Sequence, residues 1–211
     1  SSALRRGFVG AIVCILSALF IFMAAPWNQQ ALAQPERSSF IGNNFNITPG
    51  YTDSQQLSPG IAYNSNLDQW RVVWQDDRSG NYGIAGRRVD KTGTLLAEFS
   101  VLYNSDTLYH PAAAFDSTQF RYLVVWENDT DGNIAGRVLN ADGTDYSNAF
   151  IIANCTDCNN PDVVYNPLSD AYLVVWDEYN SASDKDVHGR FVGIDGTADP
   201  GGAFSIADEI D

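Results

Sequence analysis

The stretch YLVVW at residues 122–126 decides the fold. It returns letter for letter at 172–176, and a close variant, WRVVW, occupies 70–74. Catalytic groups are seldom triplicated, so the repetition first indicates a scaffold. On a β-strand, Tyr122, Val124 and Trp126 point to one face, while Leu123 and Val125 point to the other. Both faces are apolar, which predicts a strand that is covered on both sides.

Three further patterns recur around this pentapeptide in a fixed order. A Phe-x-aliphatic segment stands at 45–47, 99–101, 150–152 and 204–206. A Pro-led apolar stretch begins at residues 59, 111 and 161, and a Gly-Arg segment closed by Gly-Thr spans 84–94, 134–144 and 187–197. The segments are short, rich in Val, Ile, Tyr, Phe and Trp, and separated by Gly, Asn, Asp and Pro, which is typical of strands joined by turns. Each unit is therefore predicted to be a four-stranded antiparallel sheet.

We place the units at about 45–98, 99–149 and 150–203, with the start of a fourth at 204. Four-stranded repeats of about 40 to 50 residues, covered on both faces, are typical of β-propeller blades. The prediction is an all-β fold of propeller blades over residues 45–211. Propellers usually close with about four to eight blades, so three units form an incomplete propeller.

Three ways of completing the ring are open. Further blades could follow, a second copy of the chain could supply them, or the segment at 45–47 could serve as the outer strand of the last blade. Alone, an open array of blades leaves an apolar face at each end, which capping repeats normally cover. We therefore expect the isolated chain to associate.

The order Pro-x-x-x-Tyr-Asn, Tyr-Leu-Val-Val-Trp-acid, Ile-x-Gly-Arg-x-Val and Asp-Gly-Thr resembles tandem repeats of exported bacterial proteins predicted to be β-propellers. It is more loosely similar to the TolB-type propeller repeat. The resemblance covers about residues 45–206. It implies the propeller fold and leaves the activity open, because propellers host many functions.

The N-terminal residues have the features of an export signal. Arg5 and Arg6 precede an apolar run at 8–25, and Ala31-Leu32-Ala33 offers a signal-peptidase site. We predict a signal peptide at 1–33 and a linker at 34–44, with the protein periplasmic, at the cell surface or extracellular. The alternative is an uncleaved membrane anchor formed by residues 8–25.

The charge balance excludes one class of partner. The chain has 26 acidic and 12 basic residues, for a formal net charge of −14. Such a surface repels nucleic acid and suits an exported protein or one that binds divalent cations. No nucleic-acid partner is expected.

Residues that recur in every unit are assigned to the scaffold. These are Trp74, Trp126 and Trp176, and the arginines Arg87, Arg137 and Arg190, which we expect to form structural ion pairs within each sheet. Cys155 and Cys158, three residues apart in an oxidising compartment, are expected to form a loop disulfide.

One acidic turn is a candidate metal site. Asp129, Asp131 and Asn133 place carboxylate and amide oxygens at alternate positions around a glycine, and Ca²⁺ takes several such ligands. An ordinary hairpin turn prefers the same residues, so this reading stands beside the calcium loop.

No catalytic residue is predicted. His110 and His188 break the repeat pattern, but no nucleophile or metalloprotease motif accompanies them. We expect an exported, non-catalytic propeller module that binds or displays a glycan, a polymer or a protein ligand. The alternative is a part of a larger propeller hydrolase, such as a glycosidase, whose catalytic residues lie outside this chain.

Overall fold

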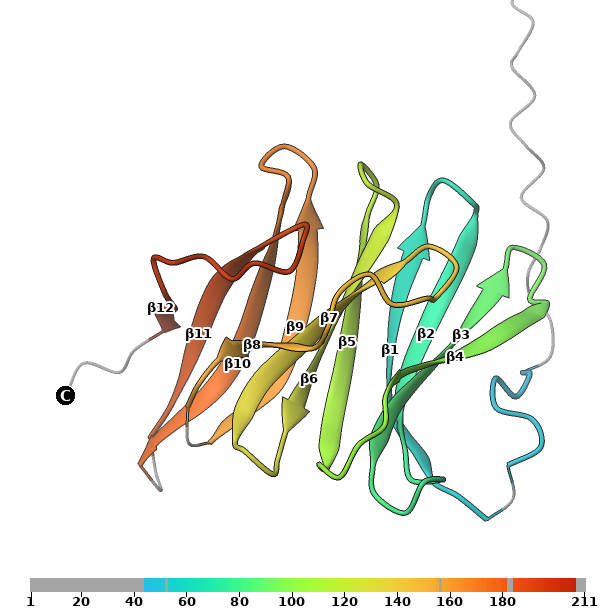
Figure 1. Cartoon of the computed structure of the whole chain (residues 1–211), viewed down its shortest axis with the longest axis horizontal. Helices are drawn as coiled ribbons and strands as arrows, with labels where there is room; N and C mark the ends of the chain where they lie inside the picture. Colours follow the sequence, from blue (N-terminus) through green and yellow to red (C-terminus); the bar gives the residue numbers. More distant parts are fainter. Residues whose placement is uncertain (1–43, 52, 156, 182–183, 208–211) are drawn as a thin grey trace, which may run out of the picture. The chain divides into compact units, whose positions relative to one another are not determined.

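The computed structural model describes residues 44–51, 53–155, 157–181 and 184–207. The predicted signal peptide or anchor, and nearly all of the predicted linker, lie outside the described residues. The described part belongs to one compact unit, Asn43–Asp211, and its regular elements are twelve β-strands (Figure 1). In this part of the chain, no helix has the length and hydrophobicity of a membrane span.

The strands form three four-stranded sheets in which each strand pairs with its neighbour in the chain. Blade 1 contains β1 (Gln56–Asn64), β2 (Gln69–Asp76), β3 (Gly83–Asp90) and β4 (Leu95–Leu102). Blade 2 contains β5 (Leu108–Asp116), β6 (Arg121–Asn128), β7 (Asn133–Asn140) and β8 (Phe150–Ala153). Blade 3 contains β9 (Cys158–Asn166), β10 (Ala171–Ser181), β11 (Asp184–Gly193) and β12 (Phe204–Ala207). All pairings given by the register are antiparallel, as predicted.

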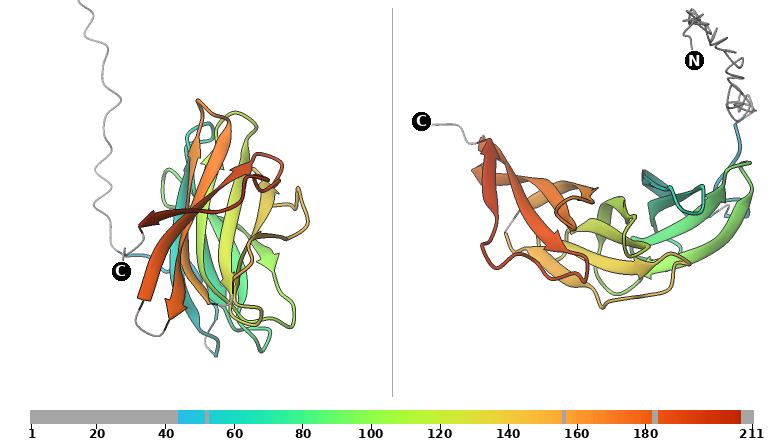
Figure 2. Two further views of the ribbon diagram at one scale, coloured as in Figure 1. Left: turned by 90° about the vertical axis from the view of Figure 1, so that its left-hand side faces the viewer. Right: turned by 90° about the horizontal axis from the view of Figure 1, so that it is seen from above.

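The hydrophobic core lies between the blades, as the two-faced pentapeptide predicted. Tyr122, Val124 and Trp126 of β6 pack with residues of blade 1. Leu123 and Val125, on the opposite face of the same strand, pack with residues of blade 3. The three sheets follow one another in chain order (Figure 2).

The predicted unit boundaries are offset by one strand from the sheets. Phe99–Val101 lie in β4 and close blade 1, where we had placed the start of the second unit. Likewise Phe204–Ile206 lie in β12, the fourth strand of blade 3, and do not open a fourth unit. The reason is that a strand that follows a turn pairs with the strand before it. Here the Phe-x-aliphatic strand pairs with the Gly-Arg strand that precedes it.

The recurring arginines connect one blade to the next. Nη1 of Arg137 in blade 2 donates to the backbone oxygen of Val101 in blade 1 at 2.6 Å. Nη1 of Arg190 in blade 3 donates to the oxygen of Ile152 in blade 2 at 2.6 Å. Arg87 makes the same contact, at 2.6 Å, with Ile47. Residues 45–47 therefore occupy, against blade 1, the place that a fourth strand occupies against blades 2 and 3.

Ion pairs within the sheets, which we had expected from these arginines, are not their shared feature. Arg87 pairs with Glu98 at 2.7 Å and Arg137 pairs with Asp145 at 3.1 Å. Arg190 instead donates from Nε and Nη2 to the backbone oxygen of Asp199. A carbonyl oxygen of the neighbouring blade is the partner that all three have in common.

Phe99 and Phe150, from two of the Phe-x-aliphatic segments, pack on the glycine of the following Asp-Gly-Thr turn. A Cβ at Gly143 would meet the Phe99 ring at 3.0 Å, and one at Gly196 would meet Phe150 at 2.6 Å. Both glycines also have a positive φ, which side chains rarely adopt. The turn thus needs glycine for its backbone and for the ring above it.

The outer faces of blades 1 and 3 are open in the described part of the chain. Ile61 of β1 is 63% exposed, while Ala113 and Val163, at the same position of the next blades, are 8% and 9% exposed. On the opposite face, Val164 of β9 is 59% exposed and its counterparts Ala62 and Ala114 are 7% exposed. Positions that are buried between blades elsewhere thus face solvent here.

Candidate functional site

The first strands of the three blades, β1, β5 and β9, lie side by side (Figure 1) and share an unusual backbone feature. The residue before each Pro, namely Ser58, His110 and Asn160, has a positive φ of 49°, 46° and 51°. Left-handed backbone is uncommon outside glycine, and such strain is concentrated at functional sites. At this point of each blade the register with the second strand also shifts, as in a β-bulge.

The three Xaa-Pro pairs line one shallow pocket of about 250 Å³. We call this the Xaa-Pro site; its lining residues are Ser58, Pro59, His110, Pro111, Asn160 and Pro161. A hydroxyl, an imidazole and an amide thus come from equivalent positions of three blades. The backbone conformation is the same at these three positions, while the side chain differs from blade to blade. A repeated scaffold can carry a single binding site in this way.

The residue after the pentapeptide of blades 1 and 2 supports the Xaa-Pro residue of the next blade. The Gln75 side-chain oxygen accepts from the backbone nitrogen of His110 at 3.3 Å. Glu127 Oε2 accepts from the backbone nitrogen of Asn160 at 3.3 Å and lies 3.0 Å from His110 Nδ1. The Glu127 side chain is only 7% exposed, so this carboxylate is buried against two residues of the site, His110 and Asn160.

A second carboxylate reaches Asn160 from blade 3. Asp177 Oδ2 accepts from Asn160 Nδ2 at 3.0 Å and from Lys185 Nζ at 2.6 Å. Burial alone would raise the pKa of Asp177, but the hydrogen bonds from Lys185 and Asn160 outweigh it and lower that pKa. Asp177 is therefore ionised at neutral pH. Glu127 and Asp177, from adjacent blades, both contact the same asparagine.

Trp126 and Trp176 are buried between blades, whereas Trp74 is buried on blade 1 against Ile47, and their indole nitrogens differ. Trp74 Nε1 donates to Asp76 at 2.9 Å. The Nε1 atoms of Trp126 and Trp176 are buried and have no hydrogen-bond partner among the described residues. All three tryptophans are buried, and their scaffold role stays a prediction.

Cys155, in the loop that leads into β9, is joined by a disulfide to Cys158, the first residue of that strand. Their sulfurs and a Glu178 carboxylate oxygen lie within 4.8 Å of one another. Because the sulfurs are bonded to each other, they offer no thiolate to a metal. The disulfide therefore gives these cysteines a structural role.

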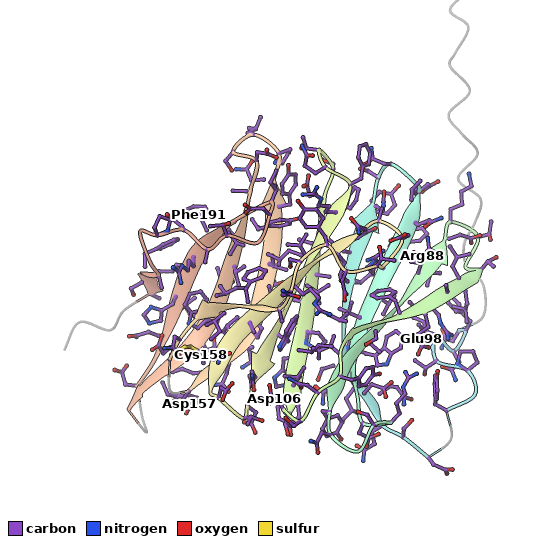
Figure 3. The ribbon with its side chains drawn as sticks, in the orientation of Figure 1. Arg88, Glu98, Asp106, Asp157, Cys158 and Phe191 are labelled. Atoms are coloured by element: carbon purple, nitrogen blue, oxygen red, sulfur yellow. A yellow bond between two sulfur atoms is a disulfide. The ribbon has the colours of Figure 1, made fainter. Side chains whose placement is uncertain are left out.

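The predicted calcium residues lie in and next to the turn between β6 and β7. Asp129 is exposed, and its backbone nitrogen donates to Thr107 at 3.0 Å. Asp131 accepts from Asn128 Nδ2 at 3.2 Å, while Asn133 is buried. A residue that sequence reasoning missed, Asp106, accepts from the same Asn128 nitrogen at 3.3 Å. Asp106 lies at one end of the blades (Figure 3).

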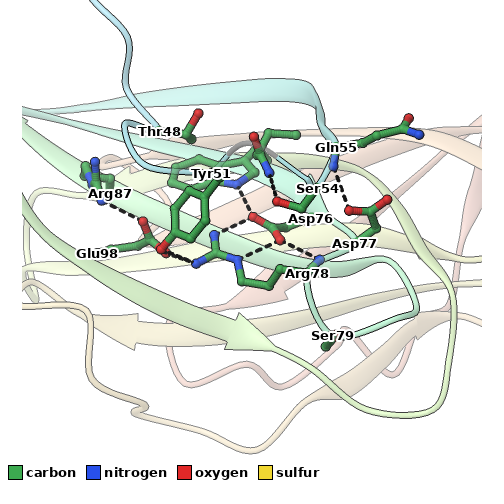
Figure 4. A network of polar contacts seen from close by, with 12 residues as sticks. Thr48, Tyr51, Ser54, Gln55, Asp76, Asp77, Arg78, Ser79, Arg87 and Glu98 are labelled. Atoms are coloured by element: carbon green, nitrogen blue, oxygen red, sulfur yellow. Dashed lines mark hydrogen bonds and ion pairs between the residues drawn. The ribbon is translucent and has the colours of Figure 1, made fainter.

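Blade 1 has a guanidinium at the matching end of its sheet (Figure 4). Arg78 forms ion pairs with Asp76 and with Glu98, and its Nη1 donates to Tyr51 Oη at 2.6 Å. The Arg78 guanidinium carbon also lies 3.9 Å from the centre of the Tyr51 ring. The network fastens the segment that precedes β1 to blade 1.

Sequence reasoning gives no site role to Gln75, Glu127 or Asp177, and it predicts no catalytic role for His110. The missed signal was that chemistry changes at fixed repeat positions, from Ser58 to His110 to Asn160 and from Gln75 to Glu127 to Asp177. At these positions the backbone conformation repeats while the side chain changes. A recurring position can therefore belong to the scaffold through its backbone and to the site through its side chain.

Neither family models nor curated protein sequences match the chain. Solved structures do match its fold. A GH43 β-1,3-galactosidase has a TM-score of 0.51 and 13% identity, over 74% of this chain and 32% of that one. A second, solved with galactodeoxynojirimycin, has a TM-score of 0.53 and 6% identity, over 77% and 61%. An exo-β-1,3-galactanase from Phanerochaete chrysosporium, solved with galactose, has a TM-score of 0.51 and 13% identity, over 72% and 36%.

These enzymes are β-propellers, so the likeness confirms the predicted fold class: the described chain is an incomplete propeller. The chain spans between 32% and 61% of the length of these three structures. At identities of 6% to 13% the likeness concerns the fold alone. The TolB-type similarity stays a prediction.

Proposed function

We propose that the chain is part of an exported propeller that binds a carbohydrate at the Xaa-Pro site. The observation that carries this proposal is the convergence of Ser58, His110 and Asn160 from three blades on one pocket. Sugar hydroxyls both donate and accept hydrogen bonds, and the site offers donors and acceptors of both kinds. The three prolines add apolar surface for the ring faces of a sugar.

The charges favour a neutral sugar. Glu127 and Asp177 lie at the site, and the whole chain carries a net charge of −14. Anionic polysaccharides would be repelled by such a field. Galactose is the natural first probe, because it is the ligand named for one of the structural neighbours.

Calorimetric titration with galactose and with β-1,3-linked galactose oligomers tests the proposal. We expect saturable binding that His110→Ala and Asn160→Ala weaken at least tenfold. His188→Ala is the matched control, because blades 1 and 2 carry Ala85 and Ala135 at that position. The proposal fails if none of these neutral sugars binds the wild type, or if the control weakens binding as much as His110→Ala does.

A second candidate function is hydrolysis of the bound glycan. It is favoured by the two carboxylates, Glu127 and Asp177, which meet at Asn160 from neighbouring blades. Glycosidases use such a pair as acid and base or nucleophile. Release of nitrophenol from an aryl β-galactoside, lost in Glu127→Gln and in Asp177→Asn, would support this alternative. Sugar binding without turnover would leave the binding function alone.

The proposal includes export through residues 1–33 and completion of the ring by further blades of the same repeat. The open face of β1 supports the second point. A second copy that packed its blade 3 directly on blade 1 would bring β12 to the place that residues 45–47 already hold against Arg87. A blade whose outer strand is residues 45–47 meets no such conflict. Mass analysis of the secreted protein, with Gln34 at its N-terminus, tests the export signal.

A further inference from the structure

A small cavity in blade 2 is lined partly by Asn and Asp side chains. Its volume is about 140 Å³, and it lies beside Trp126, between the turn that follows β6 and the segment that leads into β5. Its polar lining residues are Asn104, Asp106, Asn128, Asp131 and Asn133. The Xaa-Pro site shares none of these residues.

One buried oxygen in this cavity lacks a partner. Asn133 is 3% exposed, and its Oδ1 accepts no hydrogen bond from any described residue. Buried acceptors are nearly always satisfied, so an orphan that lines a cavity points to a missing ligand. The ligand must present a hydrogen-bond donor or a positive charge to this oxygen.

Two carboxylates converge on the same place. Asp106 Oδ2 and Asp131 Oδ2 lie 3.3 Å and 3.2 Å from one atom, Asn128 Nδ2. Asn104 Nδ2 also donates to Asp106, at 2.7 Å. Among the described residues, no Lys or Arg forms an ion pair with either carboxylate. Two negative charges are thus brought together with neutral amides alone.

Blade 1 shows what the scaffold holds at the corresponding place. There Arg78 lies between Asp76 and Glu98 (Figure 4). Counted from the pentapeptide and from the Phe-x-aliphatic segment, the counterparts in blade 2 are Asn128 for Asp76, Thr130 for Arg78 and Ala149 for Glu98. Asn128 and Ala149 both line the cavity. The cavity therefore opens where blade 1 has a guanidinium, and blade 2 sets Asp106 and Asp131 there in place of Asp76 and Glu98.

We infer that blade 2 binds one Ca²⁺ ion in this cavity, with Asp106, Asp131 and Asn133 as its side-chain ligands. Ca²⁺ takes roughly six to eight oxygens in flexible geometry and accepts carboxylates, amide oxygens and water together. Asp131 and Asn104 are exposed, which leaves room for water ligands on the outer side. A coordinated water can accept from the buried Trp126 Nε1, which also lacks a partner among the described residues.

This site differs from the loop that the sequence predicted. Asp129 is replaced by Asp106, which lies 22 residues before Asn128 and comes from the connection between blades 1 and 2. The ion therefore joins the entry of blade 2 to its own β6–β7 turn. Bound cation would stabilise the packing between these two segments.

Calorimetric titration of the full chain with CaCl₂ is the first test, with Tb³⁺ luminescence sensitised by tryptophan as a second reading. We expect one saturable site, a rise of the melting temperature with Ca²⁺, and at least tenfold weaker binding in Asp106→Asn and in Asp131→Asn. Asp129→Asn is the matched control in the same turn and should bind as the wild type does.

Thr130→Arg combined with Ala149→Glu transplants the Arg78–Glu98 ion pair of blade 1 into the cavity. This variant should fold, lose Ca²⁺ binding and no longer gain thermal stability from Ca²⁺. An Asp129→Asn variant as impaired as Asp106→Asn would overturn the assignment in favour of the simple loop. Absence of a saturable site, or several weak sites unaffected by Asp106→Asn, would remove the inference altogether. Titration with galactose in the presence of EDTA tests sugar binding at the Xaa-Pro site without Ca²⁺. The outcome of the calcium test is thereby kept separate from the outcome of the sugar-binding test.

Discussion

Arg71 provides the sharpest test of how the blades adhere. It takes, in WRVVW, the position that Leu123 and Leu173 hold in the other two copies, and it is fully buried between blades 1 and 2. Its guanidinium carbon lies 3.8 Å from the centre of the Tyr122 ring and 4.6 Å from that of Phe99. Nη2 donates to the backbone oxygen of Ala141 at 2.7 Å. Burial lowers the pKa of Arg71 to about 10, so the side chain stays charged at neutral pH.

The magnitude follows from what each substitution removes. Arg71→Ala loses a charged hydrogen bond, worth roughly 1.5–3 kcal/mol, and a desolvated cation–π contact, worth about 2 kcal/mol. Relief of the desolvation of the guanidinium offsets part of this loss, and a cavity adds to it. We expect the free energy of unfolding to fall by about 3 kcal/mol. Arg71→Leu keeps the apolar volume and leaves one carbonyl unpaired, so it should cost only about 1 kcal/mol.

Urea unfolding followed by tryptophan fluorescence and by circular dichroism measures both variants. The two probes should be compared, because repeat arrays can unfold in more than one step. A loss below about 1 kcal/mol for Arg71→Ala would refute the reasoning, since it would mean that the contacts between blades 1 and 2 carry little of the stability. Equal losses for Ala and Leu would refute the division between packing and polar contacts.

Two further predictions concern a buried hydroxyl and the open faces. Burial raises the pKa of Tyr172 above its usual 10.0, and its hydroxyl has no partner among the described residues. The folded state therefore keeps a proton that the unfolded chain releases, so the free energy of unfolding should fall as the pH rises above 10. Tyr172→Phe should flatten that fall, measured by urea unfolding at a series of pH values, without lowering stability at pH 7. Ile61→Lys and Val164→Lys should each reduce the concentration-dependent association measured by sedimentation velocity. Ala113→Lys, at the position of blade 2 that corresponds to Ile61, should instead unfold the protein. If neither exposed substitution changes association, the open faces have no role in it.

The sequence predicts the parts of the fold that depend on the alternation of side chains along a strand. Leu123 and Val125 could be assigned to one face and Tyr122, Val124 and Trp126 to the other, and hence the stacking of blades followed. The boundaries of the blades did not follow, because a repeat has no intrinsic starting point. Only the pairing of β4 with β3, and of β12 with β11, shows that the Phe-x-aliphatic segment ends each sheet.

The candidate site was harder to predict, for reasons that lie in the backbone. The left-handed conformation of Ser58, His110 and Asn160 accompanies a shift in strand register, which leaves no mark in the residue pattern. Asp106 was missed because it meets Asn128 only after two segments fold together. The arginines were recognised as structural, but a partner that is a backbone oxygen of the neighbouring blade cannot be read from side-chain types.

The arginine contacts between blades also bear on how the protein folds. They join residues 40, 36 and 38 positions apart, at Arg87, Arg137 and Arg190 respectively. The chain length between partners is thus nearly constant from one blade to the next, and so is the entropy of closing each loop. Each added blade should then dock on the preceding one at a similar rate, so that an array of such blades can fold progressively during synthesis, one interface after another.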